Sequence, residues 1–196
     1  MVKVYIQSIN NISINELKLN QFPKYRREKL ARIKDGRSKL HSYTAGLLLS
    51  EHISNKEIKL NEYGKPYCDG VYFNLSHSGD YVILAISDGT EVGCDIEYMK
   101  QADYMRLGKV VYTENELAAL TSSEDMRLKF YEFWTKKEAF MKCIGEGFHF
   151  PVKSLDITLS PEYVFYNGEK LYFVDYMLDD YRIMICSSDK DVNFIR

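Results

Sequence analysis

Residues 91–97 read EVGCDIE, and this alternation of apolar with small or acidic side chains predicts a β-strand. Three apolar side chains would form one buried face of the strand, Val92, Cys94 and Ile96. The opposite face would carry Asp95 and Glu97. Two neighbouring carboxylates repel each other and raise one another's pKa. A divalent cation would offset this repulsion, whereas the alternative without a ligand is a solvated acidic strand end.

Two further segments carry polar groups that suit the same chemistry. Residues 74–79 read NLSHSG, so a histidine and hydroxyl groups follow a predicted strand; this combination suits phosphate oxygens, or an ordinary polar turn. Residues 134–142 read WTKKEAFMK within a long predicted helix with one apolar stripe. Lys137 falls inside this stripe, where a lysine is expected to meet an anion or to snorkel. Glu138 and Lys142 would otherwise form a surface ion pair four residues apart.

Size and charge exclude several classes of protein. The chain has 196 residues and a net charge of −2, which fits one large domain or two small ones and argues against polyanion binding over the whole surface. The four cysteines follow no zinc or disulfide spacing, so we expect a reducing, cytoplasmic environment. The N-terminus lacks the apolar core of a signal peptide, and no apolar run is long enough to span a bilayer. We therefore expect no membrane partner.

Local patterns predict a first half that consists of a strand, helices and a strand meander. A capping box at residues 13–16 predicts a short helical turn. Helices are predicted over residues 24–34 and 37–53, and strands over residues 1–6, 71–76, 81–87 and 91–96. The pair Asp88-Gly89 predicts a type I′ hairpin between the last two strands.

The second half repeats this order. Helical pattern covers residues 104–120 with a break at the capping box that begins at Thr113, and a long helix, capped by Ser122 or Ser123, covers residues 124–144. Strands are predicted over residues 155–159, 163–166, 171–178 and 181–187, with a hairpin turn at Asn167-Gly168. The repeated order predicts an α+β fold of two pseudo-repeated lobes, residues 1–100 and 101–196, with the active site in the seam between them.

Positive charge is densest between Lys24 and Lys39, where eight cations are interrupted only by Glu28 and Asp35. A solvated helix face is the usual explanation of such a run. Nucleic-acid binding has weak support, because only Tyr25 offers an interleaved aromatic ring for stacking.

Taken in order, four segments resemble the Sfp-like 4′-phosphopantetheinyl transferases. They are residues 64–67 (GKPY), 73–79 (FNLSHSG), 93–97 (GCDIE) and 133–142 (FWTKKEAFMK), and the resemblance covers residues 24–150. It implies an enzyme with two similar halves that hold coenzyme A between them. Such enzymes transfer the 4′-phosphopantetheine arm of coenzyme A to a serine of an acyl or peptidyl carrier protein. They require magnesium and release 3′,5′-ADP.

The resemblance also implies a role for individual residues. The magnesium ligands would be Asp95, Glu97 and Glu138. Lys142 would neutralise charge on the transferred phosphate, and Glu114 matches the position of a general base. The groups that contact coenzyme A phosphates or the nucleotide would be Ser76, His77, Lys65 and Lys137, and the residues aligned with a 3′-phosphate site are Arg26, Arg27 and Lys29.

Two other functions are compatible with parts of this pattern. A metal-dependent nuclease also uses paired carboxylates and a lysine, but it explains the net negative charge and the histidine turn poorly. A carrier-binding module without activity would not need the three acidic residues. The sequence does not distinguish peptidyl, polyketide and fatty-acid carriers. Because both halves of the site lie in one chain, we expect a monomer, with no nucleic acid as partner.

Overall fold

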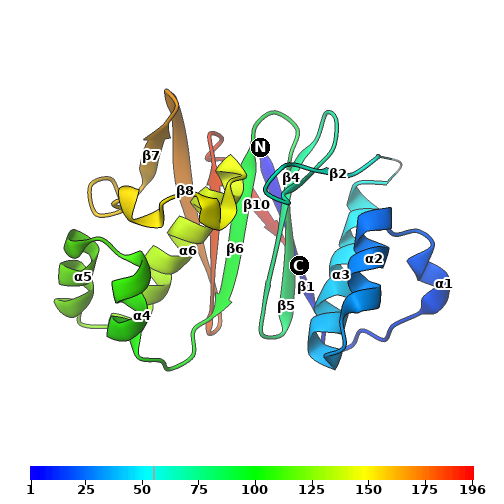
Figure 1. The fold of residues 1–196 in the computed structure, drawn as a ribbon, viewed down its shortest axis with the longest axis horizontal. Coiled ribbons are helices and arrows are strands. Elements are labelled where there is room, and N and C mark those ends of the chain that lie inside the picture. Colours follow the sequence, from blue (N-terminus) through cyan, green and yellow to red (C-terminus); the bar gives the residue numbers. More distant parts are fainter. Residues whose placement is uncertain (55) are drawn as a thin grey trace.

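The computed structural model describes residues 1–54 and 56–196. It has a mixed α+β fold, as the sequence predicts, in which two four-stranded sheets lie between two groups of helices (Figure 1). Helices α1 (Glu16–Leu19), α2 (Lys24–Arg32) and α3 (Gly36–His52) lie beside the first sheet. Helices α4 (Tyr104–Val111), α5 (Glu114–Thr121) and α6 (Met126–Ile144) lie beside the second.

The first sheet has the strand order β10-β1-β5-β4. Its members are β1 (Val2–Ser8), β4 (Tyr72–Ser78), β5 (Tyr81–Ser87) and β10 (Val192–Ile195). Strand β5 is antiparallel to both β1 and β4, whereas β10 joins β1 in parallel. Helix α3 covers one face, where a core forms from Ala45, Leu48, Leu49, Val82 and Leu84.

The second sheet has the strand order β6-β9-β8-β7. Its members are β6 (Val92–Tyr98), β7 (Tyr163–Tyr166), β8 (Glu169–Leu178) and β9 (Tyr181–Ser187). Helix α6 packs on β6 and β9, and its apolar stripe is buried as expected, with Phe130, Phe133, Phe140 and Met141 in the core. Two short 3-10 helices, Gly147–His149 and Val152–Ser154, follow α6.

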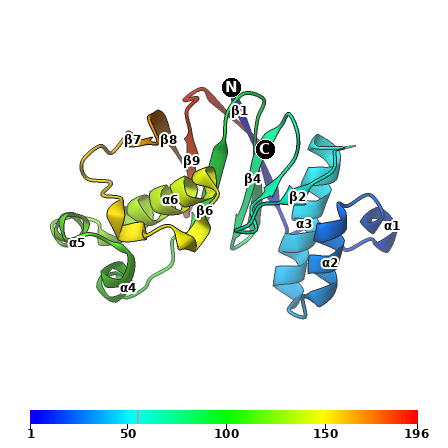
Figure 2. The same ribbon diagram turned by 45° about the horizontal axis from the view of Figure 1, so that its top comes forward.

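The inner faces of the two sheets pack against each other. The predicted apolar face of β6 lies there and contacts β1 and β5 through Val92, Cys94, Ile96, Val4 and Ile83. The opposite face of β6 lies against α6, and the helix is seen along its length beside β6 in Figure 2. A Cβ atom on Gly93 would lie 2.0 Å from the carbonyl oxygen of Ala139, so only glycine permits this approach. Helix α6 is therefore held directly over Asp95 and Glu97.

Most predicted elements are confirmed, and several details are wrong. Strands β5, β7 and β9 have the predicted bounds, and Asn167 and Gly168 both adopt positive φ in the turn between β7 and β8. The predicted caps at residue 13 and residues 122–123 are wrong, because the side chains that cap α1 and α6 are those of Asn15 and Asp125.

Three predictions about strands need correction. Asp88-Gly89 does not close a hairpin, because β5 and β6 belong to different sheets. Residues 155–159 form no strand. Buried side chains bind their backbone instead: Lys137 donates to the carbonyl oxygen of Leu155, and Glu116 accepts from the N–H group of Ile157. Strand β10 was not predicted, and it pairs with the first strand of the chain. The pseudo-repeat and the lobe boundary at residue 100 stay predictions.

Candidate active site

The two sheets meet at their edge strands β4 and β6 without backbone pairing. Side chains of β4 instead accept hydrogen bonds from free backbone N–H groups of β6. Asn74 accepts from Cys94 (3.1 Å), Ser76 accepts from Ile96 (3.4 Å), and Ser78 accepts from Tyr98 (3.1 Å). The spacing of two residues follows from the pleat of a strand. Alternation in the NLSHS segment therefore places a row of polar side chains along the seam.

Asp95 lies in the middle of this seam, with its side chain 3% exposed. Its Oδ1 accepts hydrogen bonds from the hydroxyl of Ser76 (2.9 Å) and from Nζ of Lys142 (2.6 Å). Nζ of Lys142 also donates to Ser76 (3.1 Å). Oδ2 of Asp95 is buried and has no partner among the described residues. A buried acceptor without a partner is costly, so this oxygen marks a place for a donor or a cation.

Two more carboxylates border this position. Glu97 accepts from the hydroxyl of Ser78 (2.8 Å) and from the indole N–H of Trp134 (3.3 Å), and burial together with Asp95 raises its pKa. Glu138 lies 3.8 Å from Nζ of Lys142. Burial raises the pKa of Glu138 to about 7; Lys142 opposes the shift and Asp95 reinforces it.

Among the described residues, Lys142 is the one cation that forms ion pairs with acids of this cluster, namely Asp95 and Glu138. Burial alone would lower the pKa of Lys142, but the charges of Asp95 and Glu138 raise it above its ordinary value. The Lys142 side chain is therefore a permanent ammonium in this site and does not act as a base. The cluster holds three carboxylates against one ammonium; burial is the main cause of the raised pKa values of Glu97 and Glu138, and the neighbouring Asp95 adds to both.

The predicted magnesium triad is only partly assembled. Among residues 1–54 and 56–196, no three histidine, cysteine, aspartate or glutamate side chains lie together as ready metal ligands. The ammonium of Lys142 lies between Asp95 and Glu138 instead. The unpartnered oxygen of Asp95 and the surplus of negative charge nevertheless fit a hard divalent cation, which prefers carboxylate oxygens.

A cavity of about 560 Å³ opens beside this cluster, between α2 and β4. Its lining includes three cations and one acid, together with other polar groups and apolar residues: Arg26, Lys29, Arg32, Glu28, Tyr25, Asn74, Ser76 and His77. Arg26 is 7% exposed, and its Nε is buried without a partner among the described residues. Burial and the neighbouring Arg26 lower the pKa of Lys29. Arg27 is exposed and does not line the cavity, so the structure separates it from the other two predicted cations.

His77 lines the same cavity as the side chains of Arg26 and Lys29. Burial lowers its pKa to about 4, and His41 and Lys29 add to the shift. The ring of His77 stacks on the ring of His41 with 4.6 Å between centroids, and His41 in turn contacts the carbonyl oxygen of Gly79 (2.8 Å). The stacking holds the ring of His77 in place at the wall of the cavity. Nothing in the local sequence indicated His41, which lies in α3.

Lys137 is not brought to this cluster. It forms a buried ion pair with Glu116 (2.9 Å), and it donates to the carbonyl oxygens of Val152 (2.9 Å) and Leu155 (2.6 Å). The two side chains are 2% and 0% exposed. Glu116 also accepts from the backbone N–H of Ile157 (2.9 Å). Lys137 therefore meets an anion, as its place in the apolar stripe required, but the anion is part of the protein.

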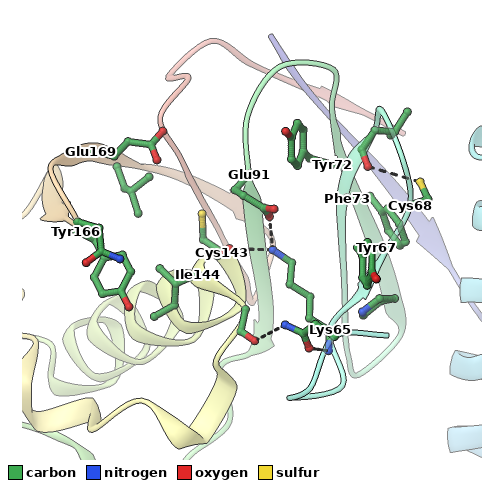
Figure 3. A pocket seen from close by; sticks show the side chains of 16 residues that line it. Lys65, Tyr67, Cys68, Tyr72, Phe73, Glu91, Cys143, Ile144, Tyr166 and Glu169 are labelled. Atoms are coloured by element: carbon green, nitrogen blue, oxygen red, sulfur yellow. Dashed lines mark hydrogen bonds and ion pairs between the residues drawn. The ribbon is translucent and has the colours of Figure 1, made fainter. Parts of the chain in front are cut away.

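Glu114 and Lys65 also lie apart from Asp95. Glu114 is exposed at the start of α5, and among the described residues it has no hydrogen bond or ion pair. The acid of this capping box that reaches α6 is Glu116, the residue that closes the box. Lys65 lies at a separate cavity of about 490 Å³, where its ammonium contacts Glu91 (Figure 3).

Sequence reasoning missed several residues of the seam, and some left a signal. The alternation N-x-S-x-S pointed to Asn74 and Ser78, and the capping box pointed to Glu116. The contact between Trp134 and Glu97 joins residues 37 positions apart, so no local pattern predicts it.

In the described part of the chain, no helix combines the length and the apolar character needed to cross a membrane.

Comparisons with known proteins point to one family. The sequence profile of the 4′-phosphopantetheinyl transferase superfamily matches residues 91–186. The chain is 39% identical over 108 residues to 4′-phosphopantetheinyl transferase gsp of Aneurinibacillus migulanus, an alignment that covers 53% of this chain and 45% of that protein. It is 40% identical over 126 residues to 4′-phosphopantetheinyl transferase AcpT of Salmonella typhimurium, covering 60% of this chain and 65% of that protein.

A longer alignment joins the chain to 4′-phosphopantetheinyl transferase ffp of Bacillus subtilis. It is 29% identical over 174 residues, which are 77% of this chain and 75% of that protein. The chain spans about half to two thirds of the length of the first two relatives. The matched profile contains β6 and α6 and therefore Asp95, Glu97, Glu138 and Lys142.

Proposed function

Because this chain belongs to the 4′-phosphopantetheinyl transferase superfamily, we propose that it transfers the 4′-phosphopantetheine arm of coenzyme A to a serine hydroxyl of an acyl or peptidyl carrier protein. The second product is 3′,5′-ADP. The observation that carries the proposal is the buried cluster of Asp95, Glu138 and Lys142 with one unpartnered oxygen, next to a cavity lined by cations.

Each group of the cluster has a role that follows from its charge. Asp95, Glu97 and Glu138 would hold a magnesium ion, which would neutralise charge on the pyrophosphate oxygens. Lys142 keeps its proton because its pKa is raised, so it supplies a fixed positive charge to the transferred phosphate. Phosphoryl transfer requires that charge on the phosphate oxygens is neutralised and that the serine hydroxyl lies in line with the leaving group. The group that takes up the serine proton is left unassigned, since Glu114 is exposed.

The cavity beside α2 binds the nucleotide end of coenzyme A. Among the three predicted 3′-phosphate contacts, Arg26 has the best support, because it is buried and its Nε lacks a partner. Lys29 and His77 line the same cavity. An arginine fork matches phosphate oxygens well. Arg27 has less support for this role, because it does not line the cavity.

Transfer itself is tested by incubating the protein with coenzyme A, magnesium and an apo carrier protein. Intact-mass spectrometry of the carrier should show the added arm, and chromatography should show 3′,5′-ADP in equal amount. Peptidyl, polyketide and fatty-acid carriers are tried in parallel, since the carrier and its pathway are open. A carrier that stays unmodified in every case, with catalytically competent relatives as positive controls, would contradict the proposal. A nuclease or an inactive binding module gives this negative result. We propose that the protein is a cytoplasmic monomer. Light scattering measures its molar mass and so tests the monomeric state.

The nucleotide end is tested with a matched pair of variants. Arg26→Met should weaken binding of coenzyme A by roughly 1.5–3 kcal/mol, the value of a charge-assisted contact, and leave binding of 3′-dephospho-coenzyme A unchanged. Arg27→Met removes the same charge one residue away and should change neither affinity. Calorimetric titration of both ligands at fixed salt decides the question. Equal affinity of the unaltered protein for the two ligands would remove α2 from the 3′-phosphate site.

A further inference from the structure

The hairpin of β2 (Lys59–Leu60) and β3 (Pro66–Tyr67) is shaped to reach α6. In the turn of this hairpin, Oδ1 of Asn61 accepts hydrogen bonds from the backbone N–H groups of Tyr63 (3.0 Å) and Lys65 (2.8 Å). Gly64 adopts a φ of 86° there. Asn61 and Lys65 are also paired through the backbone (2.9 Å). The turn is therefore fixed by its own side chain, and it presents the Asn61 amide and the Lys65 ammonium together.

Both groups contact the C-terminus of α6. Nδ2 of Asn61 donates to the carbonyl oxygen of Gly145 (3.0 Å), and Nζ of Lys65 donates to that of Cys143 (2.8 Å). The last carbonyl groups of a helix lack partners within the helix and carry partial negative charge, so an ammonium stabilises them. Cys143 directly follows Lys142 in the sequence. The hairpin therefore holds the end of α6 that carries the lysine of the proposed active site.

The same ammonium contacts a third element. Nζ of Lys65 lies 2.5 Å from Oε2 of Glu91, the residue before β6, and the Lys65 side chain is only 12% exposed (Figure 3). Strand β6 carries Asp95 and Glu97, while α6 carries Glu138 and Lys142. Lys65 thus joins the two elements whose spacing sets the geometry of the acidic cluster.

On the basis of the proposed transferase activity, we propose that Lys65 is a positioning residue that fixes α6 against β6 through Cys143 and Glu91. The resemblance to known transferases had implied a contact with a phosphate or the nucleotide. Two of the three N–H groups of the ammonium are used within the protein, and its charge is paired with Glu91. Lys65 does not line the cavity that contains Arg26 and His77.

The two roles predict opposite results for Glu91→Gln. If Lys65 positions α6, then Lys65→Met and Glu91→Gln should each lower kcat roughly tenfold with coenzyme A affinity within about twofold, because a small misplacement of reacting groups slows the chemical step. The double variant should be no slower than the slower single variant, since both remove one contact. If Lys65 bound a phosphate, Glu91→Gln would free its charge and leave kcat unchanged, while Lys65→Met would weaken coenzyme A binding.

Lys59→Met is the matched control. Lys59 lies on the same hairpin and pairs with Asp69 at 3.8 Å, but its side chain is 45% exposed and it contacts neither α6 nor β6 among the described residues. This variant should match the unaltered protein in kcat and in coenzyme A affinity. Lys65→Arg, which keeps the charge and the donors, should recover most of the activity lost in Lys65→Met.

A second measurement does not depend on activity. Lys65→Met should speed amide hydrogen exchange in the last turn of α6, and Lys59→Met should not. Unchanged exchange in Lys65→Met, or loss of coenzyme A affinity with kcat intact, overturns the positioning role. If the unaltered protein transfers nothing to any carrier, the proposed function fails, while the exchange experiment still decides whether Lys65 holds α6.

Discussion

Two lysines of α6 lie five residues apart and both form ion pairs with carboxylates, yet the number of acids and the hydrogen bonds around them differ. Lys137 faces one carboxylate, that of Glu116, and two backbone carbonyl groups, so its three N–H groups all have partners. Lys142 faces Asp95 and Glu138, with Glu97 nearby, and one oxygen of Asp95 has no partner among the described residues. Charge and hydrogen bonds are balanced around Lys137 and unbalanced around Lys142.

This difference separates a structural ion pair from a functional site. Burying a charged pair is tolerated when every donor and acceptor finds a partner, and the Lys137 pair meets that condition. The Lys142 cluster keeps the pKa values of three carboxylates raised, which costs stability in the absence of a ligand. Such a cost is typical of a site that binds a cation or a charged substrate.

The largest expected effect is on stability. Lys137→Met leaves the carboxylate of Glu116 buried and unpaired, and should lower the free energy of unfolding by about 3–5 kcal/mol. Urea unfolding measures this change. Replacing both partners, as Lys137→Met with Glu116→Gln, should recover more than half of the loss, because no buried charge remains. A single variant as stable as the unaltered protein would show that the pair is dispensable.

Asp95→Asn tests the unbalanced cluster. It should lower kcat by about a hundredfold to a thousandfold, the usual cost of removing one group that stabilises transition-state charge. Without magnesium, its melting temperature should equal or exceed that of the unaltered protein, because one of three repelling charges is gone. With magnesium, the unaltered protein should gain stability and the variant should not. Near-normal turnover at limiting magnesium would remove Asp95 from the metal site.

The pH dependence of stability should also distinguish the two clusters. The pKa of Glu138 is about 7 in the folded protein and 4.5 ordinarily, so the folded state binds more protons between these values. The stability from Glu138 is then complete below about pH 4.5 and is lost as the pH rises through about 7. Urea unfolding in a chelator should show this decline, and Glu138→Gln should show less of it. An equal decline in both proteins would assign it to Asp95 and Glu97, whose pKa values are raised as well.

The smallest effect is expected at Glu114. Because this side chain is exposed, Glu114→Gln should change kcat by less than about twofold and leave the pH profile in place. The resemblance to known transferases places a general base here, so a large loss of kcat at unchanged coenzyme A affinity would restore that assignment. Glu116→Gln, two residues away, should by contrast lower stability measurably, since Glu116 is buried and paired.

Elements with a strong local pattern could be predicted from the sequence. Alternation in residues 91–97 predicted both the strand and its buried face, and the Asn167-Gly168 turn was placed correctly because positive φ has few alternatives. The break between α4 and α5 followed from the capping box at Thr113. The Asp88-Gly89 hairpin was wrong, because a turn signal does not specify which sheet the next strand joins.

Partners that come from distant parts of the chain were not predictable in the same way. The anion expected near Lys137 is Glu116. The backbone of residues 155–157 does not form the predicted strand, because Lys137 binds the carbonyl oxygen of Leu155 and Glu116 binds the N–H group of Ile157. The assignment of Lys65 to a ligand rested on resemblance alone, and its contacts with Glu91 and Cys143 appear only in the folded chain.

The sequence by itself determined which residues have an unusual chemistry: paired carboxylates on one strand face, a lysine inside an apolar stripe, and hydroxyl groups at every second position of an edge strand. These are local facts, because the periods of helix and strand fix where neighbouring side chains point. Tertiary structure decided which of these charges are neutralised within the protein and which are left for a ligand. That outcome depends on distances between α6, β4 and β6, which the close approach at Gly93 and the contacts of Lys65 set across the seam.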